Sequence, residues 1–167
     1  MSRSDFVKQK ILEAFGDIPR PDLRAVRQLG CCKEHDGDFA WYREHTWQEL
    51  EKEIKAEHFD VFQFGSLHPS AYHYFVPGLL LGTLESIVAD AGSQHLRLAD
   101  WVRNLTPAKD RAANFREKYL PLFTARQRDA VASHLEFFNE REVERQGYSD
   151  NDKEIERALC QVWRAET

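Results

Sequence analysis

One uncharged segment restricts the fold of this chain more than any other feature. Residues 71–84, AYHYFVPGLLLGTL, contain no Asp, Glu, Lys or Arg. A helix made from them is apolar on every side, and such a helix is stable only when other elements surround it. A membrane span takes about 20 apolar residues, so this segment is too short for one. Proline lacks a backbone N–H and clashes with the preceding turn, so we expect this central helix to kink or restart at Pro77.

The rest of the chain is predicted to form amphipathic helices around that centre. Helical spacing and start signals predict helices that begin near Ser4 and Thr46, that cover 95–104, 107–120 and 124–146, and that follow 149–152. Residues 59–64, FDVFQF, alternate as in a strand, but nothing obvious pairs with them, so we expect a short extended segment. The predicted fold is therefore mainly α: a single compact domain, residues 1–167, of about six or seven helices with little or no sheet.

Composition is that of a globular protein and argues against several classes of partner. The chain is 42% hydrophobic and 31% charged, with a net charge of −5. Its basic residues are scattered, so nucleic acid is not an expected partner. The N-terminus has no apolar signal-peptide core, and three cysteines indicate no disulfide framework. We expect a cytoplasmic protein that does not associate with a membrane.

The stretch GCCKEHDGD, residues 30–38, holds the candidates for a metal site. Zinc takes four ligands, commonly from two closely spaced pairs of Cys or His. Cys32 and His35 have the spacing of one such pair, and Cys31 is adjacent. His45 and His58 are the nearest candidates from elsewhere, but neither has a partner two to four positions away; of the two, His45 is taken as the possible further ligand. The sequence therefore indicates half of a zinc motif; no other cofactor is expected.

The same stretch has two further interpretations. Gly30, Gly37 and the density of charge are typical of an ordinary loop, in which one cysteine packs inward as a small apolar residue. A nucleophilic cysteine needs a neighbour that stabilises its thiolate. Glu34, Asp36 and Asp38 disfavour a thiolate, and this argues against covalent catalysis.

No familiar catalytic pattern occurs elsewhere in the sequence. There is no glycine-rich phosphate loop, no G-x-S-x-G and no H-E-x-x-H. His73 lies among aromatic residues, where a histidine more often packs with one hydrogen bond than acts as a base. Glu140 and Glu144 share a helix face, but interleaved arginines indicate a solvated surface with ion pairs. We expect a protein that is not an enzyme; a pocket beside His73 and Tyr74 is the remaining enzymatic alternative.

The central segment also carries a family resemblance. Residues 67–77, LHPSAYHYFVP, resemble the central helix of an uncharacterised bacterial family with the pattern L-x-P-x-A-Y/F-x-Y-F/Y-x-P. Similar features flank it: Ala14-Phe15 before Pro19-Arg20-Pro21, the stretch 123–138 and the stretch 154–163. The resemblance covers most of the chain and implies the same fold. Its motifs consist of residues that pack in the core, so the resemblance implies no catalytic or binding activity. Some small acidic bacterial domains of this general kind are immunity proteins, which supplies an analogy for function.

These observations predict a non-catalytic module that binds another protein. Trp41 and Tyr42 are the predicted partner-binding anchors, because large aromatic side chains dominate interface energetics; Trp47 is expected in the core. The narrower hypothesis is an immunity or antitoxin-type protein whose partner is a toxin encoded nearby. The alternative is a zinc-binding protein with its site at the Cys31/Cys32/His35 loop.

Overall fold

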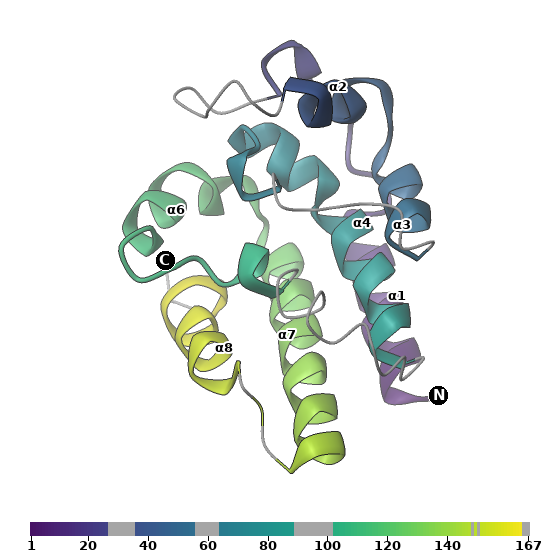
Figure 1. The fold of residues 1–167 in the computed structure, drawn as a ribbon, viewed down its shortest axis with the longest axis vertical. Coiled ribbons are helices and arrows are strands. Elements are labelled where there is room, and N and C mark those ends of the chain that lie inside the picture. Colours follow the sequence, from purple (N-terminus) through teal and green to yellow (C-terminus); the bar gives the residue numbers. More distant parts are fainter. Residues whose placement is uncertain (27–35, 56–63, 89–101, 148, 150, 165–167) are drawn as a thin grey trace.

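A computed structural model gives the arrangement of the chain and describes residues 1–26, 36–55, 64–88, 102–147, 149 and 151–164. Within these ranges the protein is mainly helical and forms no strand, which confirms the predicted fold class. The helices are α1 (Arg3–Phe15), η1 (Leu23–Ala25), α2 (Asp36–Glu44), α3 (Trp47–Lys55), η3 (Phe64–Ser66), α4 (Pro69–Val88), α6 (Ala112–Lys118), η4 (Leu120–Leu122), α7 (Ala125–Gln146), α8 (Asp152–Ala158) and the π-helix η5 (Leu159–Trp163) (Figure 1).

The uncharged segment forms the centre of the molecule. α4 runs between α3 and α7, and α1 packs against both α4 and α7 (Figure 1). Every residue from Tyr74 to Leu84 is buried, as a helix without charges requires. The helix is continuous through Pro77, so the restart that the proline signal allowed does not occur. Pro77 removes one N–H donor from the backbone hydrogen bonds of α4. The helices packed around α4 hold its remaining turns in place. Among the described helices, none is long and apolar enough to cross a membrane.

Two glycines let α3 approach the backbone of α4 closely. Gly78 and Gly82 are four positions apart and therefore lie on one face of the helix. A Cβ atom on Gly78 would lie 2.3 Å from the carbonyl oxygen of Trp47, and one on Gly82 would lie 2.7 Å from Cβ of Ile54. Any side chain at either position would push the two helices apart.

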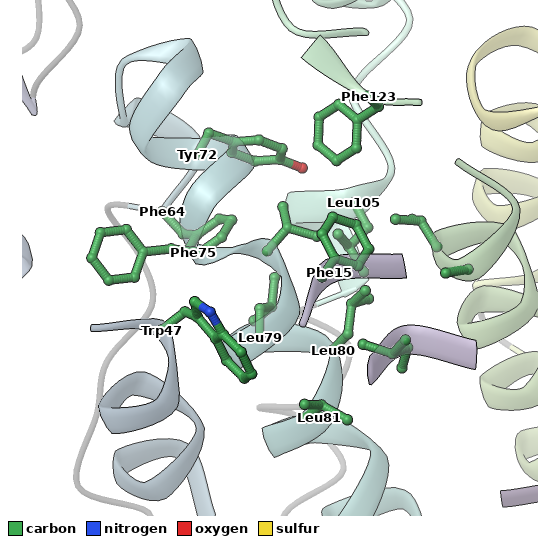
Figure 2. Close-up of a cluster of buried hydrophobic side chains, with 14 of the residues drawn as sticks. Phe15, Trp47, Phe64, Tyr72, Phe75, Leu79, Leu80, Leu81, Leu105 and Phe123 are labelled. Carbon is green, nitrogen blue, oxygen red and sulfur yellow. The ribbon is translucent and has the colours of Figure 1, made fainter. Parts of the chain in front are cut away.

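Aromatic and aliphatic side chains from several helices fill the core around α4. Phe15, Trp47 and Phe64 reach it from α1, α3 and η3 (Figure 2), and the expectation that Trp47 is a core residue is confirmed. Polar groups at the ends of buried side chains donate hydrogen bonds to acceptors in this core. The hydroxyl of Tyr72 donates to the backbone oxygen of Asn104 at 2.7 Å, as a buried phenol requires.

The helix starts predicted near Thr46 and at the beginning of 124–146 are confirmed, and each is a capping box. The backbone N–H of Thr46 donates to Oε2 of Glu49 at 2.7 Å, and that of Glu49 returns to Oγ1 of Thr46 at 3.4 Å. Thr124 and Gln127 make the same reciprocal pair at the start of α7. These bonds satisfy donors that a helix start leaves without partners, so both helices begin where the sequence predicts.

Two helix boundaries differ from the prediction. α1 is capped by Ser2 and not Ser4, because Ser2 and Asp5 exchange backbone-to-side-chain hydrogen bonds of 3.0 and 3.1 Å. The single helix predicted over 107–120 is wrong, because the chain forms the shorter α6 and then the separate turn η4. Pro121 has no N–H to extend an α-helical ladder and explains that break.

Three predicted segments lie wholly or partly outside the described residues: the loop over 30–38, the extended segment 59–64 and the helix 95–104. The loop prediction is wrong at its end, since Asp36 to Asp38 already belong to α2. Phe64, the last residue of the predicted extended segment, instead opens the 3-10 helix η3.

Candidate functional site

Of the predicted metal ligands, the structure describes only His45. Cys31, Cys32 and His35 lie outside the described residues. Nδ1 of His45 lies 2.8 Å from the backbone oxygen of Trp41. A carbonyl oxygen can only accept, so Nδ1 carries the proton and Nε2 keeps its lone pair. Within the part of the chain that the structure describes, no three His, Cys, Asp or Glu side chains come together as metal ligands, so the zinc site stays a prediction.

The two predicted partner-binding aromatics have different environments. Tyr42 is only 1% exposed and lies edge-on against Phe75, with ring centroids 4.9 Å apart. Trp41 is half-buried, and the ring of His45 stacks on it at 4.2 Å. Consecutive helix positions point in different directions, so the pair does not form one patch. Tyr42 is a core residue and not the exposed anchor that we predicted, whereas Trp41 keeps some accessible surface.

The histidine of the central segment is a packed side chain, as expected. Nε2 of His73 lies 3.1 Å from Oε1 of Gln127, and its ring contacts Phe123 with centroids 4.6 Å apart. Burial lowers the pKa of His73, and the bond to Gln127 partly opposes this. Burial also raises the pKa of Tyr74, which is almost fully enclosed. Both groups are used in packing, which gives no support to an acid–base pair here.

A second buried histidine was missed by the sequence analysis. His134, on α7, is 1% exposed, and its Nε2 lies 2.9 Å from Oγ1 of Thr83 on α4. The Thr83 hydroxyl gives its hydrogen to the backbone oxygen of Leu79 at 2.7 Å. Its oxygen therefore accepts from Nε2–H, and Nδ1 is buried with no hydrogen-bond partner among the described residues. Burial lowers the pKa of His134 to about 4, and the Leu80 carbonyl offsets part of that effect.

The acidic residues near the end of α7 fall into two groups. Glu140 and Glu144 are exposed and pair with arginines, at 3.4 Å to Arg3 and 2.7 Å to Arg141, which agrees with the predicted solvated face. Glu142 differs from them, being only 7% exposed. It accepts hydrogen bonds from Ser149 at 2.6 Å and Asn151 at 3.3 Å. This carboxylate holds the end of α7 to the start of α8.

The described surface is hollowed where the segment before η1 meets the end of α2. The groove has a volume of about 390 Å³ and is lined by Arg20, Pro21, Asp22, Leu23, Arg24 and Arg43. Both segments lie at the α2 end of the molecule (Figure 1). These basic residues look scattered in the sequence. Arg43 is far along the chain from Arg20 and Arg24, so no local pattern reveals the group.

Each arginine of the groove has a defined setting. Nη2 of Arg20 donates to the backbone oxygen of Arg43 at 2.7 Å, which joins the two segments. Nε of Arg24 lies 2.8 and 3.0 Å from the two carboxylate oxygens of Asp22, and these hydrogen bonds lower the pKa of Asp22. The guanidinium of Arg43 has no ion-pair partner among the described residues. Three positive charges and one negative charge leave the lining with a net charge of +2.

These arrangements differ in what they can do chemically. The buried histidines and Glu142 are engaged in joining helices. The groove instead presents guanidinium N–H donors at the surface, and such donors suit carboxylate or phosphate oxygens. Comparison with known proteins found no matching family model, no matching curated protein and no matching solved structure.

Proposed function

We propose that this chain is a protein-binding module without catalytic activity, and that its α2 end carries the binding surface. The observation that supports this most directly is the groove. Three arginines from two separate segments line one hollow on a chain whose overall charge is −5. Arginine is enriched at protein interfaces, where its planar donor fork binds carboxylates. Trp41 lies on the same helix as Arg43 and adds a large aromatic side chain with accessible surface.

The setting of the interior polar groups also favours binding over catalysis. A general base has to reach a substrate proton within hydrogen-bond distance. His134 is enclosed between α4 and α7, and His73 is held by Gln127. Glu142 is held by groups of the α7–α8 connection. Each of these side chains already has a structural use.

The narrower proposal is that the partner is a toxin encoded by the adjacent gene, which this chain neutralises by binding. The test is co-expression with the product of that gene. We expect the two proteins to co-purify and the growth defect caused by the toxin to disappear. R43E should weaken capture, while R141E, which changes an exposed arginine of α7, should not. The proposal is contradicted if the product of the adjacent gene does not co-purify with this chain and its toxicity is not relieved.

Zinc binding is a second candidate function, favoured by the tautomer of His45. Its Nδ1–H is fixed on the Trp41 carbonyl, which leaves Nε2 as the nitrogen with a lone pair. Metal-binding histidines commonly have their second ring nitrogen fixed in this way. Elemental analysis of protein purified without a histidine tag tests it. Equimolar zinc that is lost in C32S and H45A supports the site; zinc content that neither substitution changes ends this proposal.

A further inference from the structure

We infer that the arginine groove, formed by Arg20, Arg24 and Arg43, binds an acidic segment of a partner polypeptide. This inference deepens the proposed binding function and rests on it. Its basis is local charge: the lining carries +2 while the whole chain carries −5. An opposite charge on the partner both speeds association and selects the partner that fits.

Arg20 is held in place before any partner arrives. Pro19 and Pro21 flank it, and each proline ring fixes its own backbone φ. Its Nη2 donates to the backbone oxygen of Arg43, so one N–H of the guanidinium is used and other donors remain. The charge of Arg20 also acts on the nearby Tyr74 hydroxyl, partly opposing the burial that raises the pKa of Tyr74. Arg20 is therefore an exposed lining residue whose guanidinium is held against the end of α2.

Arg24 occupies the solvent side of the groove. Its side chain is 90% exposed, and Asp22 holds it through Nε and one terminal nitrogen. Asp22 also caps η1 by accepting from the backbone N–H of Arg24 at 3.0 Å. The carboxylate thus orients the guanidinium, while Nη1 makes no hydrogen bond to the described residues. A guanidinium group that is already fixed in this way loses less conformational entropy when it binds a carboxylate.

Arg43 contributes to the lining from the last turn of α2. No described residue neutralises its guanidinium, so an incoming carboxylate does not have to displace an existing ion pair. Pro21 and Leu23 contribute apolar surface between the arginines. This surface suits the aliphatic part of a Glu side chain, whose carboxylate then reaches a guanidinium. The combination fits a peptide better than a free inorganic anion.

The dimensions and surroundings of the groove favour acidic polypeptide over nucleic acid. A volume of about 390 Å³ holds a short peptide stretch and is near the lower end for ligand sites. Nucleic-acid binding usually uses a longer basic stripe and exposed aromatic rings for stacking. Asp22 stands inside the groove and the exposed Glu44 follows Arg43. The ring of Trp41 is already stacked with His45.

Hexaglutamate peptide is the probe for this inference, with hexalysine and a six-nucleotide oligothymidylate as comparisons. Binding to the full chain is measured by calorimetric titration at low salt and again at raised salt. We expect the wild type to bind hexaglutamate, to prefer it to both comparisons, and to lose affinity as salt rises. R20Q/R43Q should weaken binding by about tenfold or more. R141E should leave it unchanged, because Arg141 lies outside the groove, on α7, where it pairs with Glu144.

Three outcomes overturn the inference: no binding of hexaglutamate by the wild type, equal affinity in R20Q/R43Q, or tighter binding of the oligonucleotide. Circular dichroism checks that the double variant is folded. If it is not, R24Q, at a fully exposed side chain, replaces it and should still weaken binding several-fold. Capture of the toxin partner by R20Q/R43Q as strongly as by the wild type would contradict this inference and leave the binding function standing. Hexaglutamate binding that depends on the arginines, without capture of the protein encoded by the adjacent gene, would support this inference and contradict the proposed binding of that protein.

Discussion

Thr83 and His134 face each other across the buried contact between α4 and α7, with 2.9 Å between Oγ1 and Nε2. They are 51 positions apart in the chain. The hydroxyl hydrogen is committed to the carbonyl of Leu79, so the histidine must be the donor. The pair therefore requires a proton on Nε2, and burial, which lowers the pKa of His134, keeps the ring neutral. The helix pairing is sensitive to the loss of either partner through this bond, and to pH through the burial of the ring.

The first prediction is a loss of stability in mild acid caused by His134. Burial lowers the pKa of His134 from an ordinary 6.5 to about 4 in the folded state. Below pH 6.5 the unfolded chain takes up a proton that the folded chain refuses, so the free energy of unfolding falls as the pH drops toward 4. The loss approaches roughly 3 kcal/mol.

Urea unfolding of the wild type and H134Q across this pH range measures the effect. The side chain of glutamine does not titrate, so the difference between the two proteins isolates His134 from the carboxylates and from His73. We expect the gap between the two free energies to change as the pH falls. Parallel curves would show that His134 has the same pKa in the folded and unfolded states.

The second prediction concerns the other member of the pair. T83V removes the acceptor and leaves a buried Nε2–H without a partner, which should cost about 1–3 kcal/mol of unfolding free energy. T83S keeps the hydroxyl and is the matched control. Combining T83V with H134L removes both polar groups, so the double variant should be less destabilised than the sum of the single variants. Additive losses would mean that the two side chains are not coupled.

The third prediction tests the close approach of α3 and α4. In G78A the new Cβ would meet the carbonyl oxygen of Trp47 at 2.3 Å, so the backbone of α3 has to move. Overpacking of this kind costs typically 1–3 kcal/mol and outweighs the better helix propensity of alanine, which is worth about 1 kcal/mol. G65A is the control, since its nearest neighbour would be 3.4 Å away. Denaturant unfolding should show a large loss for G78A and little for G65A; similar stability of the two variants would refute the tight contact.

Local and non-local features differ in how well they follow from the sequence. The capping boxes at Thr46 and Thr124 depend on residues three positions away, and they form where expected. The uncharged segment needs only its own composition to predict a buried helix. The arginine groove and the Thr83–His134 pair each depend on residues far apart in the chain, which no local pattern reveals. The Gly78–Gly82 spacing was a readable signal that we did not use.

The candidate site follows the same rule. Trp41 and Tyr42 look alike in the sequence, yet only the packing of α2 decides that Tyr42 points into the core. Glu142 has a glutamate two positions away on each side, and only the return of the chain into α8 buries it. A residue type suggests which contacts it can make, and the tertiary fold decides which contacts it does make.

The last prediction uses Glu142 and its exposed neighbour Glu140 as a matched pair. E142A leaves the hydroxyl of Ser149 and the amide of Asn151 without their shared acceptor in a largely buried setting. We expect a loss of about 1–3 kcal/mol in unfolding free energy and faster hydrogen exchange of the backbone amides of α8, because the connection from α7 loosens. E142Q keeps one acceptor oxygen and should recover part of both effects. E140A removes a solvated carboxylate that pairs with Arg3 at 3.4 Å and should remain close to the wild type, because exposed ion pairs contribute little. If E140A and E142A change exchange in α8 equally, the carboxylate of Glu142 does not hold the two helices together.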